Sequence, residues 1–335
     1  MACFAEIKLV HGPKLAQAPE SGNMQARHLA EALMKQQQNS VTGLPASTDS
    51  AGADQSRSAP VRPFWQALVT HVAEQARTLP VPAIRHLELP PASPTGTGRN
   101  NFAALVLADG TVGLTYVALD DALAGLRAQA PAGGPALTGQ SPLALLAHYE
   151  ASTGWQRSLG MAAINAISQY VLAAGAPLEP MPDTLAMLAV KPGEHIGMVG
   201  FFGRLVRPIL AAGARLTVIE LDPSLTREEP GLSVTLDHRQ LRTCTSVIVT
   251  GTTLLNASLD TVLGHCAPGA QVNLLGPSAS CLAEPLFARG VTRVGGFQVR
   301  DTEAFLALWR GGQRWRDAGL RYQLIAPAGV AAGAA

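Results

Sequence analysis

The sequence predicts an α/β fold, with a C-terminal Rossmann-like parallel sheet covered by helices on both faces and a smaller α+β domain before it. Four short apolar runs in the second half each end in small or polar residues, and helix-like segments separate them. This alternation is typical of parallel strands joined by helical crossovers. The runs are Ile196–Gly200, Leu216–Glu220, Val247–Thr253 and Val272–Ser278. Because such sheets bind ligands beyond the carboxyl ends of their strands, the four polar clusters predict a small-molecule site.

The composition favours a mostly folded protein and disfavours a nucleic-acid or membrane partner. The chain has 335 residues, of which 47% are apolar and 15% charged, and this length is sufficient for two domains. The net charge of +1 provides no electrostatic field for nucleic acid or an anionic membrane. No segment approaches the ~18 uninterrupted apolar residues of a membrane span. We expect no nucleic-acid and no membrane partner, and a homodimer as the commonest assembly of soluble enzymes of this size.

The N-terminus and the cysteines favour a reducing, cytoplasmic setting. Glu6 and Lys8 interrupt the apolar residues of the first ten positions, so no signal peptide is expected. The four cysteines include no CxxC pair, and the spacings of 22 and 15 residues between the last three match no common zinc pattern. The eight histidines do not cluster in the sequence and form no HxxxH or HExxH motif.

The chain divides into four predicted segments. Residues 1–60 form an extension with a candidate helix at Met24–Gln38 and a polar linker, and residues 326–335 form an Ala/Gly-rich tail. Residues 61–180 form the α+β domain, and residues 181–325 form the Rossmann-like domain. The expected elements of the α+β domain are a helix at Phe64–Leu79, a strand at Ile84–Leu89, a hairpin around Asp109–Gly110, and helices near 119–128, 141–150 and 153–174.

The first candidate ligand contact is the turn Gly200-Phe201-Phe202-Gly203, which joins a strand to a helix over 204–212. Glycine allows a tight turn and a close ligand, and the helix N-terminus provides N–H groups to an anion. Gly200, Phe201 and Gly203 are therefore candidate cofactor-binding residues. The turn lacks one glycine of GxGxxG, and its two rings would crowd a pyrophosphate, so a tight turn without a ligand is the alternative.

Two acidic residues follow neighbouring strands. Glu220 lies twenty residues after Gly200 at the end of the next strand, where an acid commonly accepts hydrogen bonds from ribose hydroxyls. The same order of strand, glycine turn, helix, strand and acid occurs in dinucleotide sites and in S-adenosylmethionine sites. Asp237 follows the apolar run 232–236, where an adenine contact is expected. A lone acid at a strand end could instead cap a helix.

Hydroxyl and amide groups follow the other two strands. Thr250, Gly251, Thr252 and Asn256 come after a buried strand and can bind a polar ligand, although one of these side chains is expected to cap the helix that starts near Ser258. We take Thr250 and Gly251 as ligand-binding candidates and Thr252 and Asn256 as catalytic candidates. A further turn provides the ligand-binding candidates Gly276, Pro277 and Ser278. Cys281 has no histidine nearby in sequence, so a buried structural thiol is expected there.

These stretches resemble the putative heavy-metal chelation family of bacterial and archaeal proteins, over roughly residues 64–325. The matching segments are Asp109–Leu126, Ser158–Ile167, Ile196–Gly203, Val218–Pro223, Val247–Leu259 and Gly276–Gly296. The resemblance implies a domain like the N-terminal domain of enolase, then a Rossmann-like domain, with a cleft between them. Family members often carry a proline soon after the glycine turn, where this chain has Gly203 and Arg204, and the extension before Pro60 also departs from the pattern. Asn165, on an otherwise apolar helix, is the candidate to reach the cleft.

Three functions compete. The first is an enzyme, of transferase or lyase type, that holds S-adenosylmethionine through Gly200, Gly203 and Glu220, with the ring of Tyr116 or Phe201 facing the sulfonium. The second, following the family name, is a protein that binds a transition metal or a metal chelate, with oxygen ligands from Glu220, Asp222 and the Thr/Asn cluster. The third is a scaffold whose cleft has lost its ligand. A nicotinamide-dependent oxidoreductase is a lesser option, because the glycine turn suits pyrophosphate poorly.

Overall fold

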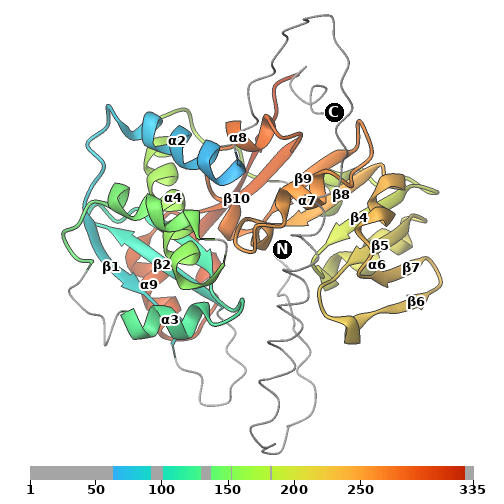
Figure 1. The fold of residues 1–335 in the computed structure, drawn as a ribbon, viewed down its shortest axis with the longest axis horizontal. Helices are drawn as coiled ribbons and strands as arrows, with labels where there is room; N and C mark the ends of the chain where they lie inside the picture. Colours follow the sequence, from blue (N-terminus) through green and yellow to red (C-terminus); the bar gives the residue numbers. More distant parts are fainter. Residues whose placement is uncertain (1–62, 92–100, 130–136, 152, 182, 329–335) are drawn as a thin grey trace, which may run out of the picture. The chain divides into compact units, whose positions relative to one another are not determined.

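The computed structural model describes residues 63–91, 101–129, 137–151, 153–181 and 183–328, all of which belong to one compact unit. Two sheets organise this unit (Figure 1). One has three strands in the order β1-β2-β3, and the other has eight strands in the order β11-β10-β9-β8-β4-β5-β7-β6. The predicted helix at Met24–Gln38, the linker and most of the tail lie outside the described residues.

The smaller sheet is an antiparallel meander. The predicted turn joins its second and third strands: the backbone N–H of Gly110 donates to the carbonyl of Leu107 at 3.0 Å, and Asp109 Oδ1 accepts from the backbone N–H of Thr111 at 2.9 Å. The elements of this half are α2 (Phe64–Ala76), β1 (Ile84–Glu88), β2 (Phe102–Leu107), β3 (Val112–Tyr116), α3 (Ala122–Gln129), the 3-10 helix η1 (Pro142–Glu150) and α4 (Gly154–Ala173). The segment predicted as a helix near 141–150 is a 3-10 helix. It begins at Pro142, and Ser141 is its N-cap.

Helix α4 is buried along most of its length because its sequence is apolar or small on nearly every side. It packs closely on β3, where Gly113 allows the approach. A Cβ atom added at Gly113 would lie 2.1 Å from the backbone oxygen of Ala162. A side chain at position 113 would therefore push the helix away from the sheet.

The larger sheet has the predicted parallel core. Strands β10, β9, β8, β4, β5 and β7 are parallel to one another, and the edge strands β11 and β6 pair antiparallel with β10 and β7. The strand order reverses between β4 and β8, which is the topological switch point of a Rossmann sheet. The strands are β4 (His195–Val199), β5 (Arg215–Ile219), β6 (Arg227–Glu229), β7 (Leu232–Thr235), β8 (Ser246–Thr250), β9 (Gln271–Leu275), β10 (Arg293–Val299) and β11 (Gly319–Ile325).

Helices cover both faces of this sheet, as alternate strand residues show. Val247 and Val249 of β8 face one apolar cluster, and Ile248 faces another. The first cluster also contains residues of α2, α4, α7 and α8, while the second contains residues of α5 and α6. The connecting helices are α5 (Thr184–Leu188), α6 (Gly203–Ala211), η2 (Pro223–Leu225), η3 (His238–Thr243), η4 (Gly251–Leu254), α7 (Leu259–Leu263), η5 (Pro277–Ala279), α8 (Glu284–Phe287), α9 (Thr302–Arg310) and η6 (Trp315–Ala318).

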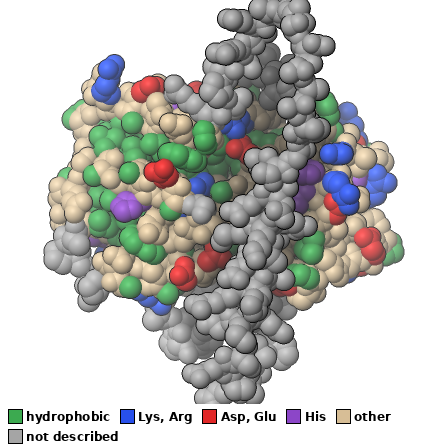
Figure 2. Space-filling model, in the orientation of Figure 1, with side chains coloured by type: hydrophobic (Ala, Val, Ile, Leu, Met, Phe, Trp, Pro, Cys, Tyr) green, Lys and Arg blue, Asp and Glu red, His purple; other side chains and the backbone are tan. Residues whose placement is uncertain are grey.

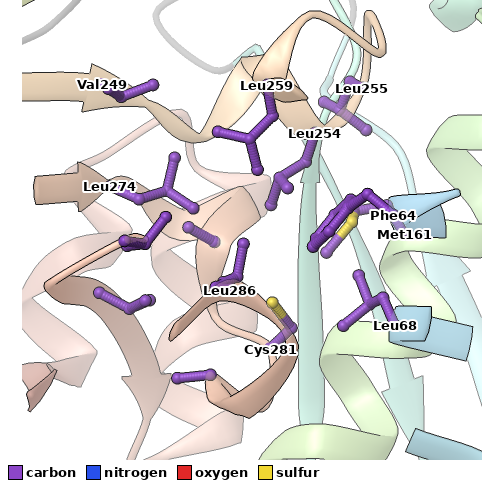
Figure 3. Packing of buried hydrophobic residues seen from close by; sticks show 14 of the residues in the cluster. Phe64, Leu68, Met161, Val249, Leu254, Leu255, Leu259, Leu274, Cys281 and Leu286 are labelled. Carbon is purple, nitrogen blue, oxygen red and sulfur yellow. The ribbon is translucent and has the colours of Figure 1, made fainter. Parts of the chain in front are cut away.

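The two sheets share their cores. Figure 3 shows Phe64 and Leu68 of α2 and Met161 of α4 in one cluster with Leu254 and Leu286 from the second half of the chain. On the smaller sheet, β2 alternates between an α4-facing cluster and a cluster built with α9 and η6. No described helix is both long enough and apolar enough to cross a membrane.

Candidate functional site

The carboxyl ends of the parallel strands place the predicted polar clusters along one edge of the larger sheet. Backbone hydrogen bonds join the first residues beyond the strands to their neighbours: the N–H of Gly200 donates to Ile219, that of Glu220 to Thr235, and that of Gly276 to Gly295, each at 3.0 Å. Because β8 also pairs with β4 and with β9, the rim is continuous from β7 to β10.

Gly200 and Thr250 meet at the switch point between β4 and β8. Gly200 has φ of +81°, a conformation that favours glycine, and a Cβ atom added there would lie 2.8 Å from Cγ2 of Thr250. The glycine is thus required both by the backbone turn and by the adjacent threonine.

The turn after Gly200 leads into α6. Phe202 is buried and its backbone N–H donates to the sulfur of Met198 at 3.3 Å, whereas Phe201 is half-buried. The guanidinium of Arg227 lies 5.2 Å from the centroid of the Phe201 ring. The Phe202 ring is thus part of the core, and the Phe201 ring remains at the rim, where its Cε1 would lie 3.1 Å from a Cβ added at Gly203.

Glu220 provides a partly buried carboxylate at this rim. Burial raises the pKa of Glu220, while hydrogen bonds from the backbone N–H groups of Leu221 and Phe201 lower it in part. The Leu221 bond is 3.3 Å long. Within the part of the chain that the structure describes, no cation forms an ion pair with this carboxylate. Glu220 therefore retains acceptor capacity for hydroxyl groups.

The other two rim acids are occupied by local contacts. Asp237 caps η3 and forms an ion pair with Arg239, whose Nε is 2.8 Å from Oδ1, and these bonds lower the pKa of Asp237. Asp222 caps η2 by accepting the backbone N–H of Ser224 at 2.8 Å. Both carboxylates thus accept local hydrogen bonds, although Asp222 is exposed to solvent.

The Thr/Asn cluster also serves its own backbone. Thr250 caps η4, whereas α7, which starts near Ser258, has no side-chain cap. The cluster therefore provides a helix cap, but for a different helix from the one predicted. Thr252 Oγ1 donates to Thr250 Oγ1 at 3.2 Å, and Asn256 Oδ1 accepts from the Ser258 hydroxyl at 2.6 Å. Thr252 and Asn256 are half-buried, so part of each side chain stays accessible beside Gly251.

Tyr116, Asn165 and Ser278 come together in the interior rather than at the open rim. Ser278 Oγ accepts the backbone N–H of Tyr116 at 2.9 Å, and Asn165 Nδ2 donates to the carbonyls of Leu114 and Ser278 at 2.6 and 3.0 Å. Asn165 is fully buried, and its Oδ1 has no hydrogen-bond partner among the described residues. Burial also raises the pKa of Tyr116.

The segment between Gly276 and Cys281 is equally enclosed. Pro277 and Ser278 are buried after Gly276, which has φ of +133°. Cys281 is fully buried and its pKa is raised to about 12 by burial. The prediction of a structural thiol at Cys281 is thus confirmed.

The η4 segment is held by side chains of Arg157 and Tyr149. These two residues were not predicted from the sequence. Arg157 Nε and the Tyr149 hydroxyl each donate to the carbonyl of Leu254 at 2.8 Å, and the guanidinium lies 4.1 Å from the Tyr149 ring centroid. Arg157 is the one charged residue in the helix sequence 154–173, and this was the available signal. A pocket of about 200 Å³ adjoins this clamp, lined by Pro63, Phe64, Trp65, Glu150, Arg157, Thr253, Ala257, Leu259 and Asp260.

Comparisons with known proteins agree with this architecture. Residues 183–320 match the model of a family described as "Putative heavy-metal chelation". An uncharacterised protein of Methanocaldococcus jannaschii is 31% identical over 156 residues, which are 45% of this chain and 58% of that protein. The chain thus spans 58% of the length of this curated relative.

Two crystal structures of proteins of unknown function from the same family share the fold. The protein from Pyrococcus horikoshii is 18% identical with a TM-score of 0.55, and the match covers 78% of this chain and 99% of that one. The protein from Desulfitobacterium hafniense is 18% identical with a TM-score of 0.57, and the coverage is again 78% and 99%. The mixed α/β architecture is therefore common to all three chains.

Proposed function

We propose that this chain, whose residues 183–320 match the model of the putative heavy-metal chelation family, binds a small molecule with an adenosine-like part at the carboxyl edge of its parallel sheet. The ligand would lie against Gly200 at the switch point, with its ribose hydroxyls on Glu220. S-adenosylmethionine is the proposed ligand, because Phe201, whose Cε1 would lie 3.1 Å from a Cβ added at Gly203, would crowd a pyrophosphate.

The observation that supports this proposal is the environment of the Glu220 carboxylate. Its carboxylate is desolvated enough for its pKa to rise, yet its described hydrogen-bond partners are backbone N–H groups and no described cation pairs with it. Two hydroxyl donors would compensate for that lost hydration, which is the usual role of an acid at the end of the second strand of such a sheet.

Calorimetric titration with S-adenosylmethionine, adenosine and 2′-deoxyadenosine tests the proposal. Hydrogen bonds to a charged group contribute about 1.5–3 kcal/mol, so Glu220→Gln should weaken adenosine binding by roughly 10- to 150-fold. Asp222→Asn is the matched control. It also removes one negative charge, two residues from Glu220, but from an exposed carboxylate that caps η2. No heat with any of the three compounds, or equal affinity in Glu220→Gln, would contradict the proposal.

A metal or metal chelate at the same rim is the second candidate, and the family description favours it. The oxygen ligands would be Glu220, Asp222 and the Thr/Asn cluster, but Asp222 is committed to Ser224. The described residues hold no group of three or more His, Cys, Asp or Glu that could bind a metal ion. Metal binding that is abolished by Glu220→Gln would favour this candidate over the adenosine ligand.

A further inference from the structure

The guanidinium of Arg157 is buried where the two halves of the chain meet, without an acidic partner among the described residues. Arg157 is 3% exposed, and its contacts are three backbone carbonyl groups and the ring of Tyr149. A buried charge in a protein is usually paired with an opposite charge. The guanidinium therefore has a capacity for an anion that the described part of the chain does not use.

The hydrogen bonds of Arg157 show which of its atoms a ligand can reach. A guanidinium has five N–H donors. Nε donates to the carbonyl of Leu254 at 2.8 Å, and Nη1 donates to the carbonyls of Tyr149 at 3.0 Å and Ala151 at 2.8 Å. The two donors of Nη2 are left without an acceptor among the described residues. Because Arg157 lines the pocket of about 200 Å³ beside η4, these two donors are available to a molecule in that pocket.

Glu150 provides the opposite charge in the same pocket. Nη1 of Arg157 binds the carbonyl groups on either side of Glu150, so the backbone of Glu150 lies next to the guanidinium. The Glu150 carboxylate is exposed and has no partner among the described residues, whereas Asp260, the other acid of the pocket, forms an ion pair with Arg289 at 2.6 Å. The described lining thus contains a cation and a carboxylate that are both unpaired.

Much of the remaining wall of the pocket is apolar. Phe64 and Leu259 are buried, and Trp65 is half-buried. Figure 2 shows hydrophobic side chains gathered over the region that Figure 1 labels α2, with acidic and basic side chains beside them. A largely apolar pocket with a few charged or polar groups is the usual form of a site for a small molecule.

From these contacts we propose that the pocket binds a free α-amino acid with an apolar side chain. The carboxylate of the ligand accepts from Nη2 of Arg157, and its ammonium group donates to Glu150. Its side chain lies against Phe64 and Trp65. A cavity of about 150 Å³ accommodates benzene, with six non-hydrogen atoms, so a pocket of about 200 Å³ suits about eight or nine such atoms, the size of valine or leucine. The adenosine site and this site are separate, and neither proposal rests on the other.

Calorimetric titration of the full chain with three probes of similar size tests this site. The probes are L-leucine, 4-methylpentanoate, which lacks the amino group, and 3-methylbutylamine, which lacks the carboxylate. We expect L-leucine to bind most tightly and 4-methylpentanoate to bind roughly 3- to 10-fold more weakly, since the lost contact with Glu150 is an exposed one. We expect no detectable binding of 3-methylbutylamine, because it cannot bind the buried guanidinium.

Two variants assign the two charged groups of the ligand to their partners. Glu150→Gln should weaken L-leucine by roughly 3- to 10-fold and should not weaken 4-methylpentanoate, because only the ammonium group contacts Glu150. Arg157→Lys keeps the charge but loses the planar fork of donors, so it should weaken both carboxylates by at least 10-fold. Glu74→Gln is the matched control, since Glu74 is an exposed acid of α2 that does not line the pocket.

The Glu150 variant and the three probes keep the proposal falsifiable even where Arg157→Lys does not fold. Absence of heat with both L-leucine and 4-methylpentanoate would overturn the proposal. The same holds for binding of 3-methylbutylamine that is as tight as that of L-leucine, and for an unchanged affinity for L-leucine in Glu150→Gln.

Discussion

Two constraints act at Gly200, one from its backbone conformation and one from its contact with Thr250, and mutations can separate their energetic effects. Its φ of +81° costs an alanine roughly 1–2 kcal/mol, and the added Cβ would also lie 2.8 Å from Cγ2 of Thr250. We expect Gly200→Ala to lower the free energy of unfolding by about 2–4 kcal/mol in urea denaturation.

Gly269 provides the matched control for Gly200→Ala. It has φ of +77°, and nothing lies within 4 Å of an added Cβ, so Gly269→Ala should show the backbone cost alone. Thr250→Ser removes Cγ2 but keeps the capping hydroxyl, and it should recover part of the loss in the Gly200→Ala background. Equal losses at positions 200 and 269 would show that the contact with Thr250 has no energetic effect.

Glu220 and Asp222 should affect stability with opposite signs. Burial raises the pKa of Glu220 above its usual 4.5, so the folded state prefers the protonated carboxyl and ionisation at higher pH destabilises it. Glu220→Gln should therefore raise the melting temperature at pH 7.5, and the gain should vanish near pH 3.5, where this carboxyl is protonated in both states.

Asp222 supplies the reverse case because hydrogen bonds with Ser224 lower its pKa below the usual 3.8. Its ionised form is favoured by folding, so Asp222→Asn should lower the melting temperature at pH 7.5, and the loss should shrink as the pH falls through the folded-state pKa. Thermal melts at both pH values check the pair. A stabilising Asp222→Asn at pH 7.5 would refute this assignment of the cap.

At the scale of elements, the short helix η4 depends on contacts from η1 and α4. The carbonyl of Leu254 accepts from both the Tyr149 hydroxyl and Arg157 Nε. Tyr149→Phe removes one donor and leaves the other, so we expect a loss of about 1–2 kcal/mol in the free energy of unfolding. Tyr170→Phe is the control, because the Tyr170 hydroxyl bonds the Pro80 carbonyl in an exposed position, and it should change stability by less than about 0.5 kcal/mol.

Most strands of the larger sheet could be predicted, because the residue pattern that indicates each strand lies within the strand itself. The runs that form β4, β5, β8 and β9 are apolar on both faces, which is the pattern of a buried parallel strand. The edge strand β6 could not be predicted in this way, since Arg227–Glu229 is a charged segment that becomes a strand only by pairing with β7. Tertiary pairing overrides its low strand propensity.

The candidate site shows the same division between local and distant information. A helix cap in the Thr/Asn cluster and a buried thiol at Cys281 could be predicted from neighbouring residues, although the capped helix is η4 and not the one near Ser258. The contact between the Asn165 amide and the Ser278 carbonyl has no signature in the sequence, because these residues are 113 positions apart. Only the tertiary packing of α4 on η5 brings them together.

At the scale of the whole molecule, the smaller sheet is covered by both halves of the chain. One face packs on α4, where Ala103, Leu105 and Leu107 meet Ala162 and Ala166. The other face packs on α9 and η6, where Val106, Val112 and Leu114 belong to a cluster with Phe305, Trp309 and Trp315. Figure 1 shows β1 and β2 between α4 and α9. The C-terminal segments therefore complete a core that the first half begins.

This shared core predicts that residues 62–181 do not fold alone. Without α9 and η6, the side chains of Val106, Val112 and Leu114 would be exposed to water, at a cost of about 1.5–3 kcal/mol each. The sum, about 5–9 kcal/mol, is comparable to the whole stability of a domain, about 5–15 kcal/mol. The isolated fragment should show no cooperative melt by circular dichroism, and adding residues 182–328 as a second fragment should restore one. A sharp melt of 62–181 alone would instead show that α4 suffices to stabilise the small sheet.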